Sequence, residues 1–299
     1  MQRRWDAGRP VDLAATLGPL RRGTGDPAHR VVGGHFWRAC VTPGGAGTVA
    51  LAAAGPVVTA QAWGPGAEWL LEQLPTMLGA DDDWSALDVS GVAVLQRARR
   101  ARPGLRLVRT GLVLDSLVPA VLEQKVTGEE ARRSWRLLLR RFGAPAPGPV
   151  EGMRVAPSPR ELLDIPTWDW HRLGVDLRRQ RTIRAAATVA GRLEECVGMT
   201  AQAAQARLQS IPGIGVWTAA ETAQRALGDP DAVSVGDYHL PNMVVHLLAG
   251  RPRGTDAEML ELLAPWAGQR QRVMRLIEST GIAAPRYGPR FAYTDIRSL

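Results

Sequence analysis

The chain has 299 residues, of which 45% are apolar and 22% are charged, enough for one large domain or two modest domains with packed cores. This composition excludes wholesale disorder. No run of 18 apolar residues occurs, which excludes an ordinary membrane-spanning helix. The formal net charge of +8 favours a phosphate-rich partner, chiefly nucleic acid. Lys125 is the single lysine, and this preference for arginine is weaker evidence because a GC-rich genome also produces it.

The first 79 residues predict an antiparallel meander followed by one helix. Short apolar or alternating runs bounded by glycine and proline are typical of strands. These runs lie at residues 35–42, 48–53 and 57–62. Residues 66–78 show the apolar spacing of an amphipathic helix, and an acidic cluster follows at residues 81–83. We therefore predict a small α+β domain over residues 1–88.

The remainder of the chain, residues 89–299, is predicted to be a helical domain. Leucine, alanine and arginine dominate its periodic segments, and glycine or proline separates many of them. The predicted helices span residues 112–126, 129–142, 159–165, 178–193, 201–209, 217–227, 240–248, 256–266 and 269–279. The expected fold class is thus mainly α, with an N-terminal α+β domain built on a small antiparallel sheet.

Cysteine and histidine usage excludes several kinds of site. The two cysteines, Cys40 and Cys196, are too few for a four-cysteine iron–sulfur cluster or zinc site, and they predict no disulfide framework. The five histidines show no metal-ligand spacing, so we expect no metal bound by side chains and no cofactor. Because the segment after Met1 lacks the apolar stretch of a secretory signal, a reducing, cytoplasmic location is expected.

The most informative stretch is a glycine turn between two predicted helices, within residues 202–227. Pro212 ends the first helix, and Gly213 and Gly215 permit positive φ and close approach of another backbone. The amides that open the second helix then point outward and form an anion site without any charged side chain. This helix-hairpin-helix pattern predicts sequence-independent binding of a DNA phosphate. A plain helix–helix turn is the alternative.

An aspartate, Asp237, follows 22 residues after Gly215, in the run Ser-Val-Gly-Asp-Tyr-His-Leu-Pro. A helix N-cap or a turn is its commonest role. If Pro241 is the first helical residue, Leu240 is the cap and Asp237 lies just outside that helix. Taken alone, Asp237 therefore indicates a cap or a turn.

Together, the glycine hairpin and the following aspartate resemble the helix-hairpin-helix DNA glycosylase superfamily. More narrowly, the sequence is similar to its bacterial 3-methyladenine DNA glycosylase II branch, which has a small α+β domain before a helical core. Residues 122–127 look like the glutamine-bearing segment at the start of that core, and residues 263–270 look like its late Pro-Trp segment. The resemblance covers most of the chain and is strongest from about residue 105 to residue 280.

The resemblance implies hydrolysis of the N-glycosidic bond of an alkylated purine of the 3-methyladenine type, in base excision repair, after the base flips into an aromatic pocket. Asp237 would be the catalytic carboxylate, which stabilises positive charge on the deoxyribose and assists the attack of water. Trp217, Tyr238 and Trp266 would supply electron-rich faces for a cationic base. Core packing is the alternative for each aromatic residue.

Two positions depart from the family pattern. Glu221 stands where relatives have an aromatic residue one turn after the hairpin tryptophan, so it would add negative potential to the base pocket or be an ordinary solvated acid. Lys125 stands where the family tends to place an apolar wedge that fills the gap left by the flipped base. Its aliphatic stem would fill that gap, or its ammonium group would bind phosphate. Both departures bear on lesion preference more than on activity.

The resemblance also implies DNA contacts and, in some members, a monovalent cation held by backbone carbonyls of the hairpin. The expected DNA-binding residues are Gly213, Gly215, Gln124, Lys125 and Thr218. The carbonyls that match the cation site belong to Gln209, Ile211 and Ile214. Further candidates for phosphate contacts, with a solvated helix face as the alternative, are Arg178, Arg179 and Arg181.

Relatives that also nick the strand carry a lysine near the position of Trp217. Because a Schiff-base mechanism needs an amine and Lys125 is the only lysine, we predict a monofunctional glycosylase without lyase activity. The expected partner is double-stranded DNA containing damaged bases, with no membrane association, and a monomer is expected. Two alternatives stay open: a non-catalytic damaged-DNA-binding protein of the same fold, and a glycosylase for neutral deaminated purines such as hypoxanthine.

Overall fold

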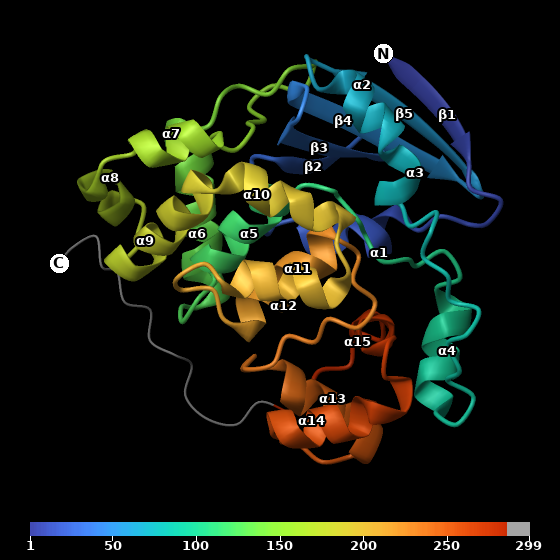
Figure 1. The fold of residues 1–299 in the computed structure, drawn as a ribbon. Coiled ribbons are helices and arrows are strands. Elements are labelled where there is room, and N and C mark those ends of the chain that lie inside the picture. The colour runs from blue at the N-terminus through green and yellow to red at the C-terminus, as the bar shows by residue number, and fades with distance from the viewer. Residues whose placement is uncertain (286–299) are drawn as a thin grey trace.

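A computed structural model describes residues 1–285, and its N-terminal part is a five-stranded antiparallel sheet (Figure 1). The strand order is β1-β5-β4-β3-β2, so the first strand pairs with the last. The strands span Gln2–Asp6 (β1), His29–Val32 (β2), His35–Thr42 (β3), Gly45–Ala54 (β4) and Val57–Trp63 (β5). The three strands predicted from the sequence are confirmed, and β1 and β2 are additional.

Short helices cover one face of this sheet, where a core forms around Leu51, Leu70 and Leu74. They span Leu13–Leu17 (α1), Ala67–Glu72 (α2) and Leu74–Met77 (α3), with a 3₁₀ turn η1 at Gly18–Leu20. The single helix predicted over residues 66–78 is in fact two. Gln73 ends α2 and begins α3, and Pro75 in the first turn of α3 has no N–H to continue the α2 ladder.

The rest of the described chain is helical, as predicted. The helices are α4 (Ala93–Ala101), α5 (Val113–Leu122), α6 (Gly128–Phe142), α7 (Pro159–Asp164), α8 (Thr167–Arg172), α9 (Leu177–Thr188), α10 (Ala190–Glu194), α11 (Ala201–Gln209), α12 (Val216–Ala226), α13 (Leu240–Ala249), α14 (Asp256–Leu263) and α15 (Arg270–Ser279), with 3₁₀ turns η2 (Glu195–Gly198) and η3 (Ala264–Trp266). Helices α1, α4 and α8 were not predicted, and the segment predicted as one helix over 178–193 breaks at Val189.

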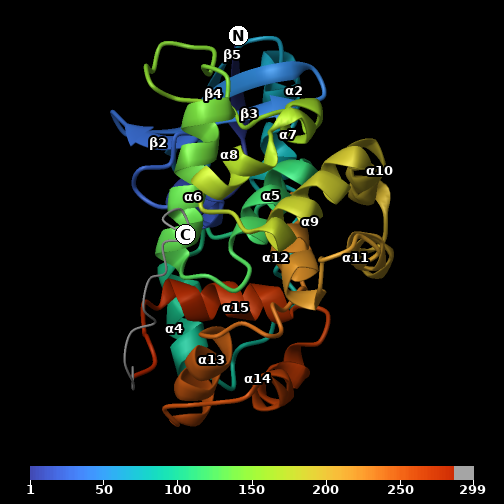
Figure 2. The ribbon, with the colours of Figure 1, turned by 90° about the vertical axis from the view of Figure 1, so that its left-hand side faces the viewer.

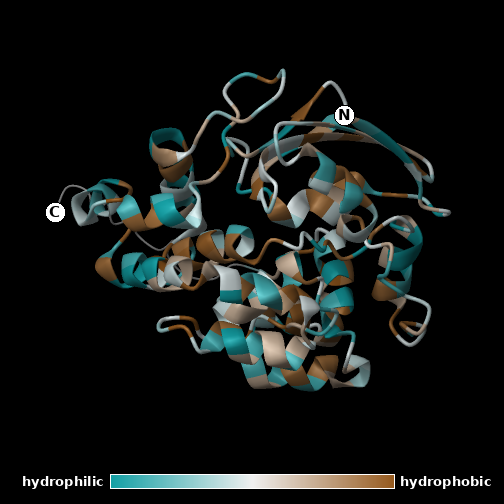
Figure 3. Ribbon diagram, turned by 45° about the horizontal axis from the view of Figure 1, so that its top comes forward, coloured by the Kyte–Doolittle hydropathy of each residue, from teal (hydrophilic) through white to brown (hydrophobic). Residues whose placement is uncertain are grey.

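Two apolar clusters organise these helices. The larger one surrounds α5, which is buried along nearly its whole length, and joins it to α6, α9, α11 and α12. The second joins α4 to α13, α14 and α15 at the opposite end from the sheet (Figure 2). Most helical segments carry both apolar and polar residues, as amphipathic helices do (Figure 3). The predicted fold class, mainly α with an N-terminal α+β part, is confirmed.

The segment before α4 packs with the C-terminal helices. Trp84, Leu87 and Val89 belong to the cluster of α13–α15, whereas Val108 and Leu112 pack under the sheet. The chain therefore crosses between the two parts more than once, and a boundary at residue 88 stays a prediction. Among residues 1–285, no helix combines the length and apolar character that a bilayer crossing requires.

Candidate active site and DNA-binding hairpin

The predicted hairpin is formed by α11 and α12, and its two glycines have different roles. Gly213 has φ +91°, and a Cβ there would lie 2.0 Å from Thr182 Oγ1, so this position requires glycine. Gly215 has φ −96°, and a Cβ would meet nothing within 4 Å. The expectation that Gly215 also uses positive φ is therefore wrong. This glycine instead leaves open space in front of α12.

Gln124 and Thr218 hold the hairpin together. Gln124 Nε2, just after α5, donates to the Gly213 carbonyl at 3.0 Å and to Thr218 Oγ1 at 2.8 Å. The Thr218 side chain is buried and its Oγ1 accepts this bond, and the predicted role of Thr218 in DNA binding stays a prediction. The backbone amides of residues 216–218 lie in the first turn of α12, where no preceding helical carbonyl accepts from them.

Lys125, the residue after Gln124, has a strained backbone conformation. It lies in the turn between α5 and the capping box of Thr127 and Glu130 that begins α6. Its φ is +55°, and it is the one non-glycine residue with positive φ among residues 1–285. Such a conformation costs about 1 kcal/mol or more. The side chain of this single lysine is exposed, next to the Gln124 that contacts the hairpin.

Asp237 lies at the start of α13 and faces α12. Its Oδ1 accepts from the amides of His239 at 2.7 Å and Leu240 at 2.9 Å, while its Oδ2 accepts from the indole Nε1 of Trp217 at 3.1 Å. Of the two expected roles, this geometry is that of a turn, because His239 is the N-cap of α13 and Asp237 lies outside the helix. Three donors orient a carboxylate that stays partly exposed, and the N-terminus of α13 favours its negative charge.

Asp237 also lines a cavity of about 190 Å³ between α12, α13 and α15. The lining residues are Pro19, Leu107, Val108, Glu221, Gln224, Arg225, Asp237, Leu240, Gln271, Met274, Arg275 and Glu278. None of these twelve residues is aromatic. Besides Asp237, six of them carry a carboxylate, a carboxamide or a guanidinium group. This wall therefore offers hydrogen bonds and charge, whereas an aromatic pocket was expected.

Glu221 belongs to this wall and is not an ordinary surface acid, because only 8% of it is exposed. Its Oε2 pairs with Arg225 Nη1 at 2.8 Å, and its Oε1 accepts from Ser234 Oγ at 2.6 Å. The carboxylate is therefore charge-compensated. Glu221 lines the same cavity as Asp237, and its role at a base pocket stays a prediction.

The predicted aromatic pocket residues are not brought together. Trp217 contacts Asp237 but is not among the residues lining the cavity. Tyr238 is 74% exposed and meets only the His239 ring edge-on among aromatic neighbours. Trp266 packs against the α13–α15 cluster and donates its indole N–H to the Asp88 carbonyl at 2.6 Å. A pocket role for these three aromatic residues stays a prediction.

The remaining predicted contacts have mixed outcomes. The Ile211 carbonyl already accepts from the Ile214 amide at 3.0 Å, and a cation on the carbonyls of the hairpin stays a prediction. Residues 1–285 contain no cluster of acidic, histidine and cysteine side chains suited to a metal. Arg179 is buried and bonds Asp176 and the carbonyls of Leu122 and Gly174, so it holds α9 to α5 and is not a phosphate ligand.

The sequence analysis missed the residues that α15 contributes to the cavity, namely Gln271, Met274, Arg275 and Glu278. Their spacing of three and four residues is the only sequence signal, since it puts them on one helix face. That signal does not say what the face meets.

Part of the sequence is similar to that of a curated protein. No family model matches the sequence. A Mycobacterium tuberculosis protein described as a probable bifunctional transcriptional activator/DNA repair enzyme AlkA is 36% identical over 172 residues, which is 56% of this chain and 32% of that protein. The match thus spans about a third of the length of the curated relative.

Solved structures share the fold over nearly the whole chain. A 3-methyladenine DNA glycosylase from Archaeoglobus fulgidus superposes with a TM-score of 0.77 at 19% identity, covering 93% of this chain and 97% of the other. An 8-oxoguanine glycosylase/lyase from Clostridium acetobutylicum, bound to double-stranded DNA, gives 0.70 at 10% identity, with 94% and 97% covered. The predicted resemblance to the helix-hairpin-helix DNA glycosylases, and to their 3-methyladenine branch, is confirmed.

Proposed function

The chain has the fold of the helix-hairpin-helix DNA glycosylases, and on this premise we propose that it releases damaged bases from double-stranded DNA. The proposed substrate is an alkylated purine of the 3-methyladenine type, and the proposed reaction is hydrolysis of its N-glycosidic bond. The observation that carries the proposal is the position of Asp237, a partly exposed carboxylate at the wall of a base-sized cavity and in contact with the hairpin helix.

In this proposal the hairpin holds the backbone of the DNA. The amides of residues 216–218 would donate to a phosphate, and the open space in front of Gly215 lets the phosphate approach. Because Trp217 on the same helix donates to Asp237, the proposed phosphate site and the carboxylate would be linked through α12. Lys125 would lie against the DNA near the gap left by the flipped base.

Asp237 would act on the deoxyribose. Positive charge develops on the sugar as the base leaves, and a fixed carboxylate close to the reacting carbon stabilises it without reorganisation. The two amides and the indole fix the orientation of Asp237. A carboxylate in this position would also orient or deprotonate the attacking water. Glu221, held by Arg225 and Ser234, would give the cavity wall a hydrogen-bonding edge for the base.

The proposal includes no strand cleavage. Strand-nicking by the Schiff-base route needs an amine nucleophile, and α12 contains no lysine. Lys125 lies in the α5–α6 turn, next to Gln124, whose side chain donates to the Gly213 carbonyl of the hairpin. We further propose that the protein acts as a monomer on duplex DNA in the cytoplasm.

The test is to incubate the protein with alkylated duplex DNA and to identify the released bases by mass spectrometry. We expect free 3-methyladenine and an intact abasic strand until alkali is added, with no adduct after borohydride treatment. Binding without release would favour a non-catalytic damage-binding protein. Release of hypoxanthine alone would favour the deaminated-purine alternative, and an adduct lost in Lys125→Ala would contradict the absence of lyase activity.

A further inference from the structure

Helix α6 carries three arginines along its outer face. Arg132, Arg136 and Arg140 are spaced four residues apart, so their side chains lie one above another along the helix. We call these three residues the arginine stripe. The opposite face of α6 is apolar and packs into the larger core cluster around α5. Arg132 and Arg140 are exposed and Arg136 is half-buried, so the stripe lies at the molecular surface.

The arginine stripe keeps its positive charge. None of its three members forms an ion pair with another side chain among residues 1–285. Two nearby acids are used elsewhere, since Glu130 belongs to the capping box that begins α6 and Asp169 pairs with Arg141 at 2.5 Å. Glu129, in the first turn, is the one exposed acid of this helix. The surface along α6 therefore has a surplus of positive charge.

The stems of two of these arginines lie close to a glycine loop of the N-terminal part. A Cβ at Gly23 would lie 2.7 Å from Cδ of Arg132, and a Cβ at Gly25 would lie 3.1 Å from Cδ of Arg136. Arg21, at the start of the same loop, adds a further positive charge. Because the stems are packed while the guanidinium groups lack an acidic partner, less side-chain entropy is lost when these groups bind a ligand.

The arginine stripe begins near the hairpin. Helix α6 starts three residues after Lys125, and Gln124 donates to the Gly213 carbonyl at 3.0 Å. From there α6 runs from the level of α12 towards the sheet (Figure 2). Since an α-helix rises 1.5 Å per residue, the stripe spans about 12 Å, which is the axial length of about three to four phosphates on one DNA strand.

We propose that the arginine stripe binds phosphates of the duplex DNA that flanks the damaged base. This inference rests on the proposed function, in which the hairpin holds the DNA near the start of α6. Guanidinium groups pair with phosphate oxygens through two parallel N–H donors. Such contacts position the duplex without reading its sequence. The stripe extends the DNA-binding surface from the hairpin towards the sheet.

An acidic protein is the alternative partner, and it fits this surface less well. The centres of protein–protein interfaces are enriched in aromatic and other apolar side chains. None of the large apolar residues that are exposed among residues 1–285 lies on α6. A row of arginines without exposed apolar neighbours suits a ligand whose negative charges are regularly spaced, as those of a DNA backbone are.

The test measures the salt dependence of DNA binding in variants that keep the arginine stems. Undamaged and abasic duplexes are titrated at several salt concentrations with wild type and with the double variant Arg132→Gln, Arg140→Gln. Each lost phosphate contact should reduce the slope of log K against log salt by about one. Affinity for a long duplex should fall at least about tenfold at low salt. Lysine at both positions keeps the charge and should keep the slope.

The double variant Arg97→Gln, Arg100→Gln is the matched control. Both arginines are exposed on α4, which packs with α15 on the other side of the molecule in Figure 1. This variant removes the same charge and should leave the slope at its wild-type value. Duplexes shortened on one side or the other of the abasic site give a second control. The effect of the α6 variant should vanish on the duplex that lacks the flank reaching the stripe.

Three outcomes would overturn the inference: an unchanged slope in the α6 variant, an equal loss in the α4 variant, or a loss that persists on every shortened duplex. The first of them would favour an acidic protein as the partner. Failure of the proposed function is distinct, because it appears as absence of base release from alkylated DNA. The salt slopes are measured on duplexes that hold no damaged base to release.

Discussion

Two aspartates, Asp26 and Asp237, each sit where parts of the fold meet, and their surroundings differ. Asp26 is 2% exposed, and its two oxygens accept four bonds, from the amides of Arg22 and Ala28, from His29 Nδ1 and from Trp135 Nε1. Asp237 accepts three bonds and remains partly exposed beside a cavity about 190 Å³ in volume.

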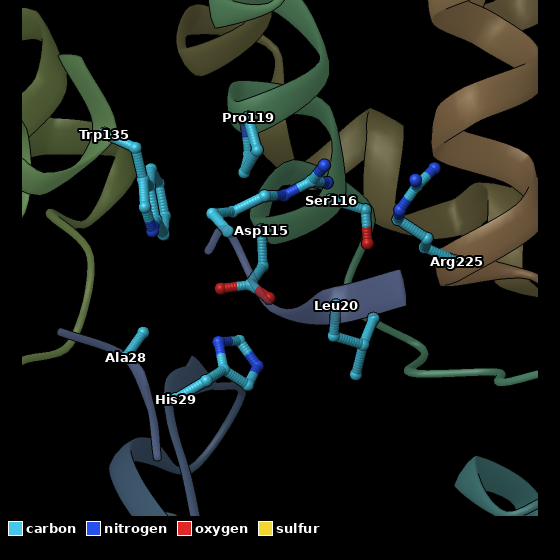
Figure 4. A pocket seen from close by; sticks show the side chains of 9 residues that line it. Leu20, Ala28, His29, Asp115, Ser116, Pro119, Trp135 and Arg225 are labelled. Atoms are coloured by element: carbon cyan, nitrogen blue, oxygen red, sulfur yellow. The ribbon is translucent and has the colours of Figure 1, made fainter. Parts of the chain in front are cut away.

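The cavity near Asp26 is correspondingly small. Its space of about 10 Å³ is enclosed by side chains from the sheet part and from α5, α6 and α12, including His29, Asp115, Trp135 and Arg225 (Figure 4). Ion pairs between Arg22 and Glu123 at 2.8 Å, and between Arg38 and Asp115 at 2.8 Å, cross the same boundary. The buried carboxylate of Asp26 accepts four hydrogen bonds and holds two parts of the fold together. The carboxylate of Asp237 lines a cavity and can contact a ligand there.

The largest expected effect concerns the stability role of Asp26. Asp26→Ala leaves the buried Trp135 Nε1 and the amides of Arg22 and Ala28 without their acceptor, so we expect the free energy of unfolding to fall by about 3 kcal/mol. Urea unfolding monitored by tryptophan fluorescence measures this loss. Asp81→Ala, at an exposed aspartate, is the control and should change little. Wild-type stability in Asp26→Ala would contradict the structural role of Asp26.

Asp237 should behave in the opposite way. Asp237→Asn keeps an oxygen for the amides of His239 and Leu240 but loses the acceptor of Trp217 Nε1. Because Trp217 and Asp237 are both partly exposed, the melting temperature should fall only slightly. Loss of the preorganised charge should slow release of 3-methyladenine by roughly two orders of magnitude, with binding to abasic DNA nearly intact. Single-turnover release and a binding titration separate the two effects, and near-wild-type release would remove Asp237 from the catalytic role.

The pH dependence of the free energy of unfolding also reports on Asp26. Burial alone would raise the pKa of Asp26, but the charge of His29 and the hydrogen bonds from His29, Arg22 and Trp135 lower it from 3.8 to about 2. A depressed pKa stabilises the folded state above pH 4 and loses that contribution as the pH falls towards 2. The loss is about 2 kcal/mol. Urea unfolding between pH 5 and pH 2 should show this slope in the wild type and a shallower one in Asp26→Ala.

The smallest effect separates the two hairpin glycines. Gly215→Val should leave stability unchanged, because nothing lies within 4 Å of its Cβ, but it should weaken binding to abasic and undamaged duplexes alike, by about tenfold. Gly213→Ala should instead destabilise the fold, since it combines positive φ with a clash against Thr182. If a folded Gly215→Val protein binds duplex DNA as tightly as wild type, the hairpin does not contact the DNA.

Local sequence determined the hairpin and its neighbours. Pro212 and Gly213 stop one helix and turn the chain within a few residues, and the apolar spacing of the flanking segments makes both helices, so α11 and α12 follow from short-range rules. The same rules place Asp237 just before α13, because Pro241 belongs in a first helical turn. Strands β3, β4 and β5 likewise show their own apolar runs.

Tertiary structure decided what local patterns do not encode. Strand β1 reads Gln-Arg-Arg-Trp-Asp and has no apolar run of its own, so it becomes a strand only because β5 supplies an edge more than 50 residues away. Gln271 and Trp266 lie only a few residues apart on amphipathic segments, yet one meets the cavity of Asp237 and the other packs against Asp88. An amphipathic pattern states that a face is buried, and only the packing of α15 against α12 and α13 determines what that face touches.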